Sequence, residues 1–186
     1  MQGGLTLGAK DYYLNNDAAT VAIREAYKSY LSKMFQLYGF SADEAAKKAS
    51  AVFLHETTLA TFSKSRTELR DPQANYNKMT LAEFKENYPN IPLEALANAE
   101  GIKSEYLKEM IVGQPAFFAG YDKVAAAECA GTLKALMEWD IICSSASYLS
   151  DEIREARFEF FGKIMSGRKE DYPLWKRATV QVEAQL

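Results

Sequence analysis

His55 and Glu56 begin the stretch whose residue types come nearest to a known catalytic pattern, His55-Glu56-Thr57-Thr58-Leu59. On a helix, the pattern H-E-x-x-H brings two histidines to one face, where they bind zinc while the glutamate serves as a general base. Here Leu59 stands in the second histidine position, and His55 is the only histidine in the sequence. The zinc motif is therefore absent, and we predict that His55 is a partly exposed helix residue.

Glu56 lies on the apolar side of the helix that must carry it. The capping box Ser41-Ala42-Asp43-Glu44 opens this helix, which is predicted to run to about Phe62. Spacings of three and four residues define an inward stripe that consists of Ala45, Ala49, Val52, Glu56 and Leu59. An unpaired carboxylate on such a stripe would be costly. We therefore expect Glu56 to be buried with an arginine or several amides as partners, and Arg66 and Arg70 are the nearby candidates.

A polar connector, Arg70–Leu81, follows this helix and reads R-D-P-Q-A-N-Y-N-K-M-T-L. Asp71-Pro72 is a turn signal, and the two asparagines can hydrogen-bond the local backbone. The connector ends in a second capping box, Thr80–Glu83. We expect it to fix how the flanking helices meet, with Arg70 or Asp71 in buried polar contacts. No residue is assigned to catalysis, cofactor or metal; the candidates for structural polar roles are Glu56, Arg70, Asp71, Tyr76 and Asn77.

Start and stop signals divide the chain into amphipathic helices joined by long ordered connectors. After an irregular start at residues 1–16, helices are predicted at residues 17–38, 41–62, 81–88, 92–101, 115 onwards, 132–147, 153–165 and 174–186. Residues 109–113 form the one β-prone run, which is too isolated to define a sheet. The sequence thus predicts an all-α, multi-helix domain of about six to eight helices, with residues 1–186 as a single helical region.

Composition and charge argue against several classes of protein. Hydrophobic residues make up 48% of the chain and aromatic residues 12%, which indicates a packed globular protein. The net charge of −3, with scattered basic residues, gives no electrostatic case for binding nucleic acid. No apolar run approaches the roughly 20 residues that span a membrane. The first residues do not form a signal peptide, so either the protein stays in the cytoplasm or the export signal lies outside this chain.

Several smaller features receive structural interpretations. Cys129 and Cys143 lie in apolar helical sequence and are predicted to be small buried hydrophobes. Trp139 is predicted to pack in the core or at an interface. Residues 168–171 are predicted to be a solvated loop. The chain stops without a C-cap glycine, a basic final turn or a tail, which favours a cut inside a longer polypeptide over a frayed natural terminus.

Short motifs follow one another along the chain in a recognisable order. Residues 8–14, G-A-K-D-Y-Y-L, are similar to G-L-P-x-x-D-Y-Y, and residues 56–60 match E-x-x-L/I-A. Arg70-Asp71-Pro72 with residues 76–81 matches R-D-P…Y-N-K-M-T-L closely, and residues 112–118 resemble V-G-Q-P-x-F-F. Further matches are Leu133 to Trp139, Tyr148 to Ser150, Phe158 to Gly167, and Trp175-Lys176-Arg177, which is similar to R-W-K-R.

In this collinear order the whole chain resembles the neprilysin and endothelin-converting-enzyme family of zinc metalloendopeptidases, in the helical region before the catalytic motifs. There are departures from the family pattern. Ala9-Lys10 replaces Leu-Pro, Leu174 replaces the arginine before Trp175, and Ala178 stands where the animal enzymes have a cysteine. The missing cysteine weakens any disulfide inference and favours a bacterial-type member.

The resemblance implies a role without a catalytic residue. Family members bind zinc through H-E-x-x-H and a downstream E-x-x-x-D segment, and both lie C-terminal to the region that this chain matches. The resemblance therefore implies no cofactor in this segment, zinc in the parent enzyme, and an extracytoplasmic location. Its implied partners are peptide substrates and the C-terminal catalytic domain, with this segment inactive alone but roofing the substrate cavity.

Three hypotheses for function follow. In the first, the chain is the helical N-terminal segment of a neprilysin-like metalloendopeptidase, which accounts for the missing motifs, the missing signal and the abrupt end. In the second, it is a stand-alone helical module that binds peptides or proteins without catalysis. In the third, it is a cryptic metalloenzyme that uses His55 and Glu56, which stoichiometric zinc on this chain would support.

Overall fold

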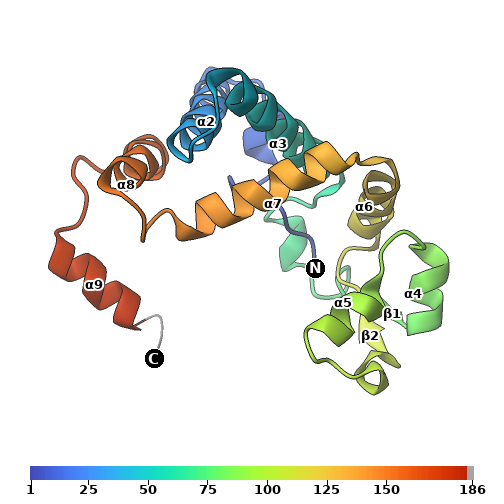
Figure 1. Cartoon of the computed structure of the whole chain (residues 1–186). Helices are drawn as coiled ribbons and strands as arrows, with labels where there is room; N and C mark the ends of the chain where they lie inside the picture. The colour runs from blue at the N-terminus through green and yellow to red at the C-terminus, as the bar shows by residue number, and fades with distance from the viewer. Residues whose placement is uncertain (184–186) are drawn as a thin grey trace.

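The computed structural model describes residues 1–183, which form nine α-helices and one two-stranded sheet (Figure 1). In chain order the elements are α1 (Asp11–Leu14), α2 (Ala18–Leu37), α3 (Ala42–Phe62), η1 (Glu68–Arg70), β1 (Lys78–Met79), α4 (Leu81–Asn87), α5 (Leu93–Ala99), η2 (Ser104–Leu107), β2 (Met110–Ile111), α6 (Pro115–Ala127), α7 (Ala130–Ser145), α8 (Asp151–Arg157), η3 (Phe158–Ile164) and α9 (Leu174–Glu183). The all-α fold class is confirmed. The predicted number of helices was too low because α1 lies in the start predicted to be irregular, and the predicted helix beyond residue 183 lies outside the described part.

Local capping signals set the helix ends as predicted. The Asp17 carboxylate accepts a hydrogen bond from the backbone N–H of Thr20 at the start of α2, and Gly39 takes the positive φ of +109° after its end. Both predicted capping boxes are present, at the start of α3 and at the start of α4. Pro92, predicted as a first helical residue, is instead the N-cap of α5.

The larger hydrophobic core consists of buried side chains from the start of the chain, α1, α2, α3, α7, α8 and η3, and is rich in aromatic rings. Tyr30 stacks on Phe160 with ring centroids 5.0 Å apart, and Trp139 meets Tyr30 edge-on at 5.7 Å. Trp139 is only 4% exposed, so its predicted core position is confirmed. The members of this core include Tyr13, Tyr27, Tyr30, Leu31, Met34, Phe35, Val52, Trp139, Ile142 and Phe160.

A smaller hydrophobic core consists of Phe84, Tyr88, Ile91 and Val112. It lies by the sheet, in which Lys78 pairs with Ile111 and Met79 with Met110 in antiparallel register. The prediction that the β-prone run forms no sheet was wrong, because its partner strand is the end of the polar connector. In Figure 1 this region occupies one end of the molecule, α9 occupies the other, and α7 lies between them.

The predicted helix at residues 153–165 is α-helical only in its first half. Its second half, η3, is a π-helix in which the Met165 N–H donates to the Phe160 carbonyl. A Cβ on Gly162 would lie 2.2 Å from a ring atom of Phe158, so this turn requires a glycine there. The change in helix type alters the register of the aromatic side chains that enter the larger core.

Candidate functional site

Glu56 lies at the polar centre of the larger core and is only 3% exposed. The Thr6 hydroxyl donates to Oε1 over 2.6 Å, and the hydroxyls of Tyr13 and Tyr27 each donate to Oε2 over 2.8 Å. The predicted burial of Glu56 is confirmed. The predicted arginine or amide partners were wrong, because all three donors are hydroxyl groups.

Two of these hydroxyls also accept hydrogen bonds and so connect Glu56 to further elements. The Trp139 indole N–H donates to the Thr6 hydroxyl over 3.1 Å, and the Leu7 backbone N–H donates to the Tyr13 hydroxyl over 3.1 Å. Each of these two hydroxyls can donate its proton to Glu56 while its oxygen accepts a hydrogen bond from the second N–H group. These hydrogen bonds connect the start of the chain to α3 and α7.

Burial governs the titration of this cluster. Loss of solvation raises the pKa of Glu56 above its ordinary range, although the three hydroxyl donors act in the opposite direction. Burial and the neighbouring Glu56 carboxylate likewise raise the pKa values of Tyr13 and Tyr27. Both carboxylate oxygens are engaged by protein groups, so the arrangement is suited to holding a segment in place rather than to acid–base chemistry.

His55 is a neighbour of Glu56 in sequence but has a different partner. Its Nδ1 atom lies 2.7 Å from Oε2 of Glu128, which follows the end of α6. The two side chains diverge because successive residues of an α-helix are rotated by about 100° around its axis. Within residues 1–183 no group of three His, Cys, Asp or Glu side chains is arranged to hold a metal ion. The residues described here therefore do not fit a zinc site.

The predicted polar contacts of the connector are placed differently in the structure. Arg70 and Asp71 are both exposed, so the expectation that one of them makes buried contacts was wrong. Asp71 instead accepts hydrogen bonds from the backbone N–H groups of Gln73 and Ala74, which fixes the turn locally. The Asp71 side chain is short, so it accepts hydrogen bonds from the backbone of its own turn and does not extend to the core.

Asn75 and Gln114 form the polar contact that joins the connector to α6. The Gln114 amide donates to Asn75 Oδ1 over 3.1 Å, and Gln114 is only 2% exposed. Gln2 completes the arrangement, because its backbone N–H donates to the Gln114 side chain over 2.8 Å. Sequence reasoning missed Gln114 and Gln2, since their spacing of more than a hundred residues gives no local signal.

Tyr76 and Asn77 occupy the strand side of the connector. Tyr76 is 62% exposed, whereas the Asn77 carbonyl accepts a hydrogen bond from the Val112 N–H over 2.8 Å, next to the sheet. A second polar contact that the sequence did not reveal is Asp122 on α6. It accepts hydrogen bonds from the backbone N–H and the side-chain amide of Asn90 over 2.7 and 2.9 Å.

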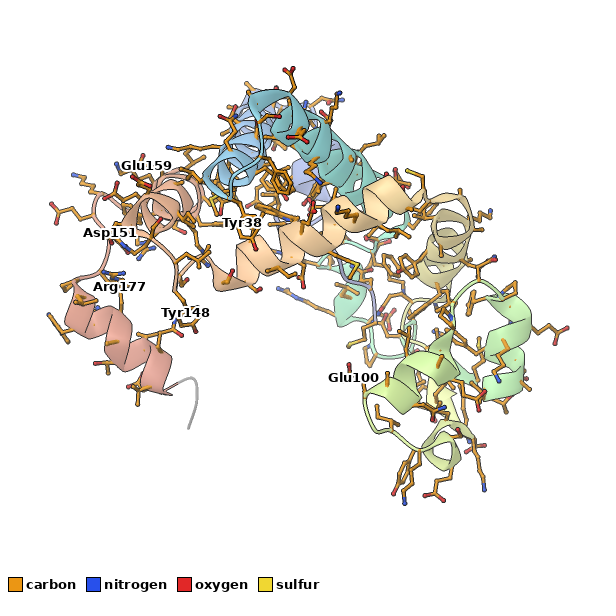
Figure 2. The ribbon with its side chains drawn as sticks, in the orientation of Figure 1. Tyr38, Glu100, Tyr148, Asp151, Glu159 and Arg177 are labelled. Atoms are coloured by element: carbon orange, nitrogen blue, oxygen red, sulfur yellow. The ribbon has the colours of Figure 1, made fainter. Side chains whose placement is uncertain are left out.

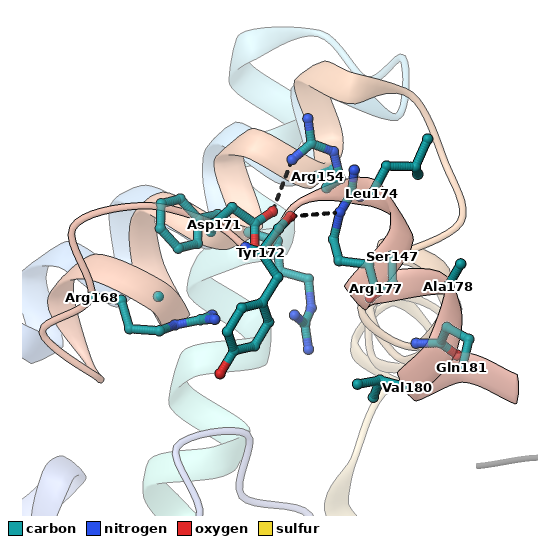
Figure 3. Close-up of a pocket in the computed structure, with 13 residues that line it drawn as sticks. Ser147, Arg154, Arg168, Asp171, Tyr172, Leu174, Arg177, Ala178, Val180 and Gln181 are labelled. Carbon is teal, nitrogen blue, oxygen red and sulfur yellow. Dashed lines mark hydrogen bonds and ion pairs between the residues drawn. The ribbon is translucent and has the colours of Figure 1, made fainter. Parts of the chain in front are cut away.

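A pocket of about 320 Å³ lies between α8, η3 and α9 (Figure 3). We call it the arginine pocket, because Arg154, Arg157, Arg168 and Arg177 line it. Arg168 and Asp171 are half-buried in its wall, whereas Lys169 and Glu170 are exposed, so the prediction of a solvated loop is confirmed in part. Arg154 forms an ion pair with Asp171 over 2.9 Å.

Aromatic rings complete the wall of the arginine pocket. The Arg168 guanidinium lies over the rings of Phe158 and Tyr172, at 5.2 and 4.8 Å from their centroids. Arg177 donates through Nε to the Tyr172 carbonyl over 3.1 Å. Tyr148, just after α7, donates a hydrogen bond to Gln181 on α9 and is labelled with Arg177 in Figure 2. The pocket therefore combines positive charge with apolar walls.

The two cysteines differ in their surroundings. Cys143 is half-buried beside the larger core, as predicted, and burial raises the pKa of its thiol. Cys129 is exposed at the N-cap of α7, so its predicted burial was wrong. A hydrogen bond with the Thr132 hydroxyl lowers the pKa of the Cys129 thiol.

None of the helices in residues 1–183 combines the length and the apolar character that crossing a bilayer requires.

Comparison with known proteins places the chain in a family. The model of peptidase family M13, in its N-terminal part, matches residues 1–186. Endothelin-converting enzyme 1 of Bos taurus is 26% identical over 195 residues, which cover 100% of this chain and 25% of that protein. An endothelin-converting enzyme homolog of Locusta migratoria is 28% identical over 94% of this chain and 25% of its own length.

A solved structure supports the same assignment. In a crystal structure of Mycobacterium tuberculosis zinc metalloprotease Zmp1 with an inhibitor, the matching region has a TM-score of 0.93 and 26% identity, over 99% of this chain and 28% of that chain. The chain spans about a quarter of the length of the relatives that it matches. The resemblance to the neprilysin family is thereby confirmed, and the chain belongs to peptidase family M13, whose N-terminal region it matches along its whole length.

Proposed function

We propose that this chain is the helical, non-catalytic segment of a zinc metalloendopeptidase, in which it forms the scaffold and part of the roof over the cavity for peptide substrates. The observation that carries the proposal is the match of all 186 residues to the N-terminal part of peptidase family M13. The close likeness to a zinc metalloprotease of which this chain covers only 28% supports it further. The catalytic machinery then belongs to the remaining polypeptide.

In this proposal zinc is bound outside the present chain. The donor set supports that division, because residues 1–183 offer no cluster of three metal-ligating side chains. Bound there, zinc supplies an activated water for the attack on a peptide carbonyl. The present residues contribute a rigid helical frame that shapes the cavity and restricts entry to peptides. We place the parent protein outside the cytoplasm, by analogy with the family.

The test compares the full polypeptide with the present chain, each with zinc and each after chelation. We expect the full polypeptide to hydrolyse a quenched fluorescent peptide in a zinc-dependent way and the 186-residue chain to be inactive. A parent gene that ends at residue 186 without a downstream H-E-x-x-H would refute the proposal. Peptide binding by the isolated chain, independent of zinc, would then favour the alternative of a stand-alone binding module.

A further inference from the structure

The guanidinium groups of the arginine pocket outnumber the carboxylates available to them. Arg154 has carboxylate partners, but Arg157, Arg168 and Arg177 have no carboxylate oxygen within 4.0 Å in residues 1–183. The Nε atom of Arg157 is buried and has no hydrogen-bond partner there. A buried donor without an acceptor costs about 1–3 kcal/mol and is rare in a complete structure. The excess of guanidinium groups over carboxylates points to an anionic group that belongs in the pocket.

The helix beside the pocket exposes apolar side chains. α9 has no buried residue within its described length, and Leu174, Trp175, Val180 and Val182 are 72%, 70%, 47% and 58% exposed. Leu174 and Val180 also line the arginine pocket, so the charged and apolar surfaces adjoin. Several exposed apolar side chains on one short helix are typical of an interaction site. A group that fits both surfaces carries an anion next to apolar side chains.

The position of α9 indicates what covers it. The likeness to zinc metalloprotease Zmp1 extends over 99% of this chain, so it includes α9 in the same arrangement. A helix without buried side chains is weakly held by its own packing. The relative nevertheless keeps this arrangement, and this chain covers only 28% of that protein. The part of that relative outside the matched region is long enough to supply such contacts.

We propose that the arginine pocket and the adjoining exposed face of α9 are the docking site for a segment of the remaining polypeptide, one that presents a carboxylate flanked by apolar side chains. This inference rests on the proposed function, because it requires the larger peptidase chain. A carboxylate can accept paired hydrogen bonds from a guanidinium group. The Arg168 side chain is already held by two aromatic rings, and the Arg157 side chain lies over the Phe161 ring. Docking therefore costs little further side-chain conformational entropy at these two arginines.

The test measures amide hydrogen exchange of residues 174–183 in the isolated chain and in the full polypeptide. We expect exchange to be at least about tenfold slower in the full polypeptide, because docking suppresses local opening of α9. The double variant Arg157→Gln/Arg168→Gln should lose most of this protection. Raising the ionic strength should have the same effect, because salt screens partly exposed ion pairs. Lys169→Gln is the matched control, because this exposed cation beside Arg168 does not line the pocket.

A second variant guards against loss of folding. Trp175→Ala removes an exposed side chain, so it should leave the thermal midpoint of the isolated chain unchanged while it weakens protection in the full polypeptide. Equal exchange in both proteins, or protection that the arginine variants leave intact, would overturn the docking site. Concentration-dependent protection of the isolated chain would show that a second copy is the occupant, which also overturns it. Peptidase activity measured on the same samples separates the two proposals: activity without protection refutes docking alone, and protection without activity refutes the proposed function alone.

Discussion

Each hydrophobic core is accompanied by a buried carboxylate, Glu56 within the larger core and Asp122 beside the smaller one, but the two carboxylates accept from different donors. In the larger core, Glu56 accepts hydrogen bonds from hydroxyl groups on three segments of the chain. Beside the smaller core, Asp122 accepts two hydrogen bonds, both from Asn90. The first carboxylate joins α3 to three segments that lie 29 to 50 residues away, whereas the second joins α6 to one segment that lies 32 residues away. One carboxylate therefore holds several segments together, and the other holds a single pair of segments together.

This contrast has a physical basis in how the donors are placed. Amide donors on the backbone of a turn are always available, so Asp122 needs only one facing segment. A hydroxyl reaches a carboxylate only where packing brings it, and the three around Glu56 depend on the closure of the larger core. The Glu56 hydrogen bonds therefore form only when the larger core packs, and once formed they stabilise that packing. Substitutions of Glu56 and Asp122 should therefore differ in the unfolding free energy that they cost and in how much of the chain they destabilise.

The largest effect is expected for Glu56→Ala. The substitution leaves three hydroxyl donors without their acceptor in a buried site, and each such loss costs about 1–3 kcal/mol before relaxation. We expect the free energy of unfolding to fall by about 3 kcal/mol, with a single cooperative transition in urea. Glu86→Ala on α4 is the control, because that glutamate is exposed. A change for Glu56→Ala within roughly ±0.5 kcal/mol, the usual surface range, would contradict the global role of the network.

The next effect concerns the contact between α3 and α6, which connects the regions of the two cores. A Cβ on Gly120 would lie 2.1 Å from the Phe62 ring. Gly120→Ala should therefore lower the free energy of unfolding by about 2 kcal/mol, because overpacking in a filled site forces side chains and backbone to shift. In α7, a Cβ on Gly131 meets only the Cys129 sulfur at 3.8 Å. Gly131→Ala should be neutral or slightly stabilising, since alanine is the better helix former, and equal effects of the two variants would disprove the close contact.

A smaller and more local effect is expected for Asp122→Ala. The substitution removes the acceptor of two hydrogen bonds from Asn90, and Asp122 is 9% exposed, so water can compensate in part. We expect a loss of about 1 kcal/mol in the free energy of unfolding. Amide exchange should accelerate at Asn90 and Ile91 but remain unchanged in α2. Acceleration throughout α2 and α3 would show that both carboxylates fasten the whole fold.

The same contrast separates what the sequence revealed from what it did not. Helix starts follow from local chemistry, so the capping boxes at Ser41 and Thr80 were predictable. The apolar stripe predicted that Glu56 is buried, because periodicity reports which face is inward. It did not identify the partners of Glu56, because Thr6 and Tyr13 come from another segment and carry no pairing signal.

The errors have equally specific causes. Arg70 and Asp71 were expected inside because the connector looked over-specified, but the buried polar contact is made by Asn75 with Gln114. The sheet was missed because each strand has only two residues, too few to show the alternation that marks a strand. Non-local contacts decided each of these points. The structural importance of the five polar candidates, Glu56, Arg70, Asp71, Tyr76 and Asn77, stays a prediction.

The smallest effect is the pH dependence that Glu56 contributes. Burial raises its pKa above the ordinary value of 4.5, so the folded protein holds this proton more tightly than the unfolded chain does. As the pH rises from about 4.5 through the folded-state pKa, the unfolded chain ionises first, and the folded state loses stability by this contribution. Glu56→Gln does not titrate, whereas carboxylates with lowered pKa, such as Glu44 and Glu83, are common to both proteins. The free energy of unfolding of the natural protein minus that of Glu56→Gln should therefore decrease with pH over this window in urea titrations. An increase would mean that the hydroxyl donors outweigh burial and that the network stabilises the ionised form, which would make Glu56 resemble an ordinary paired carboxylate.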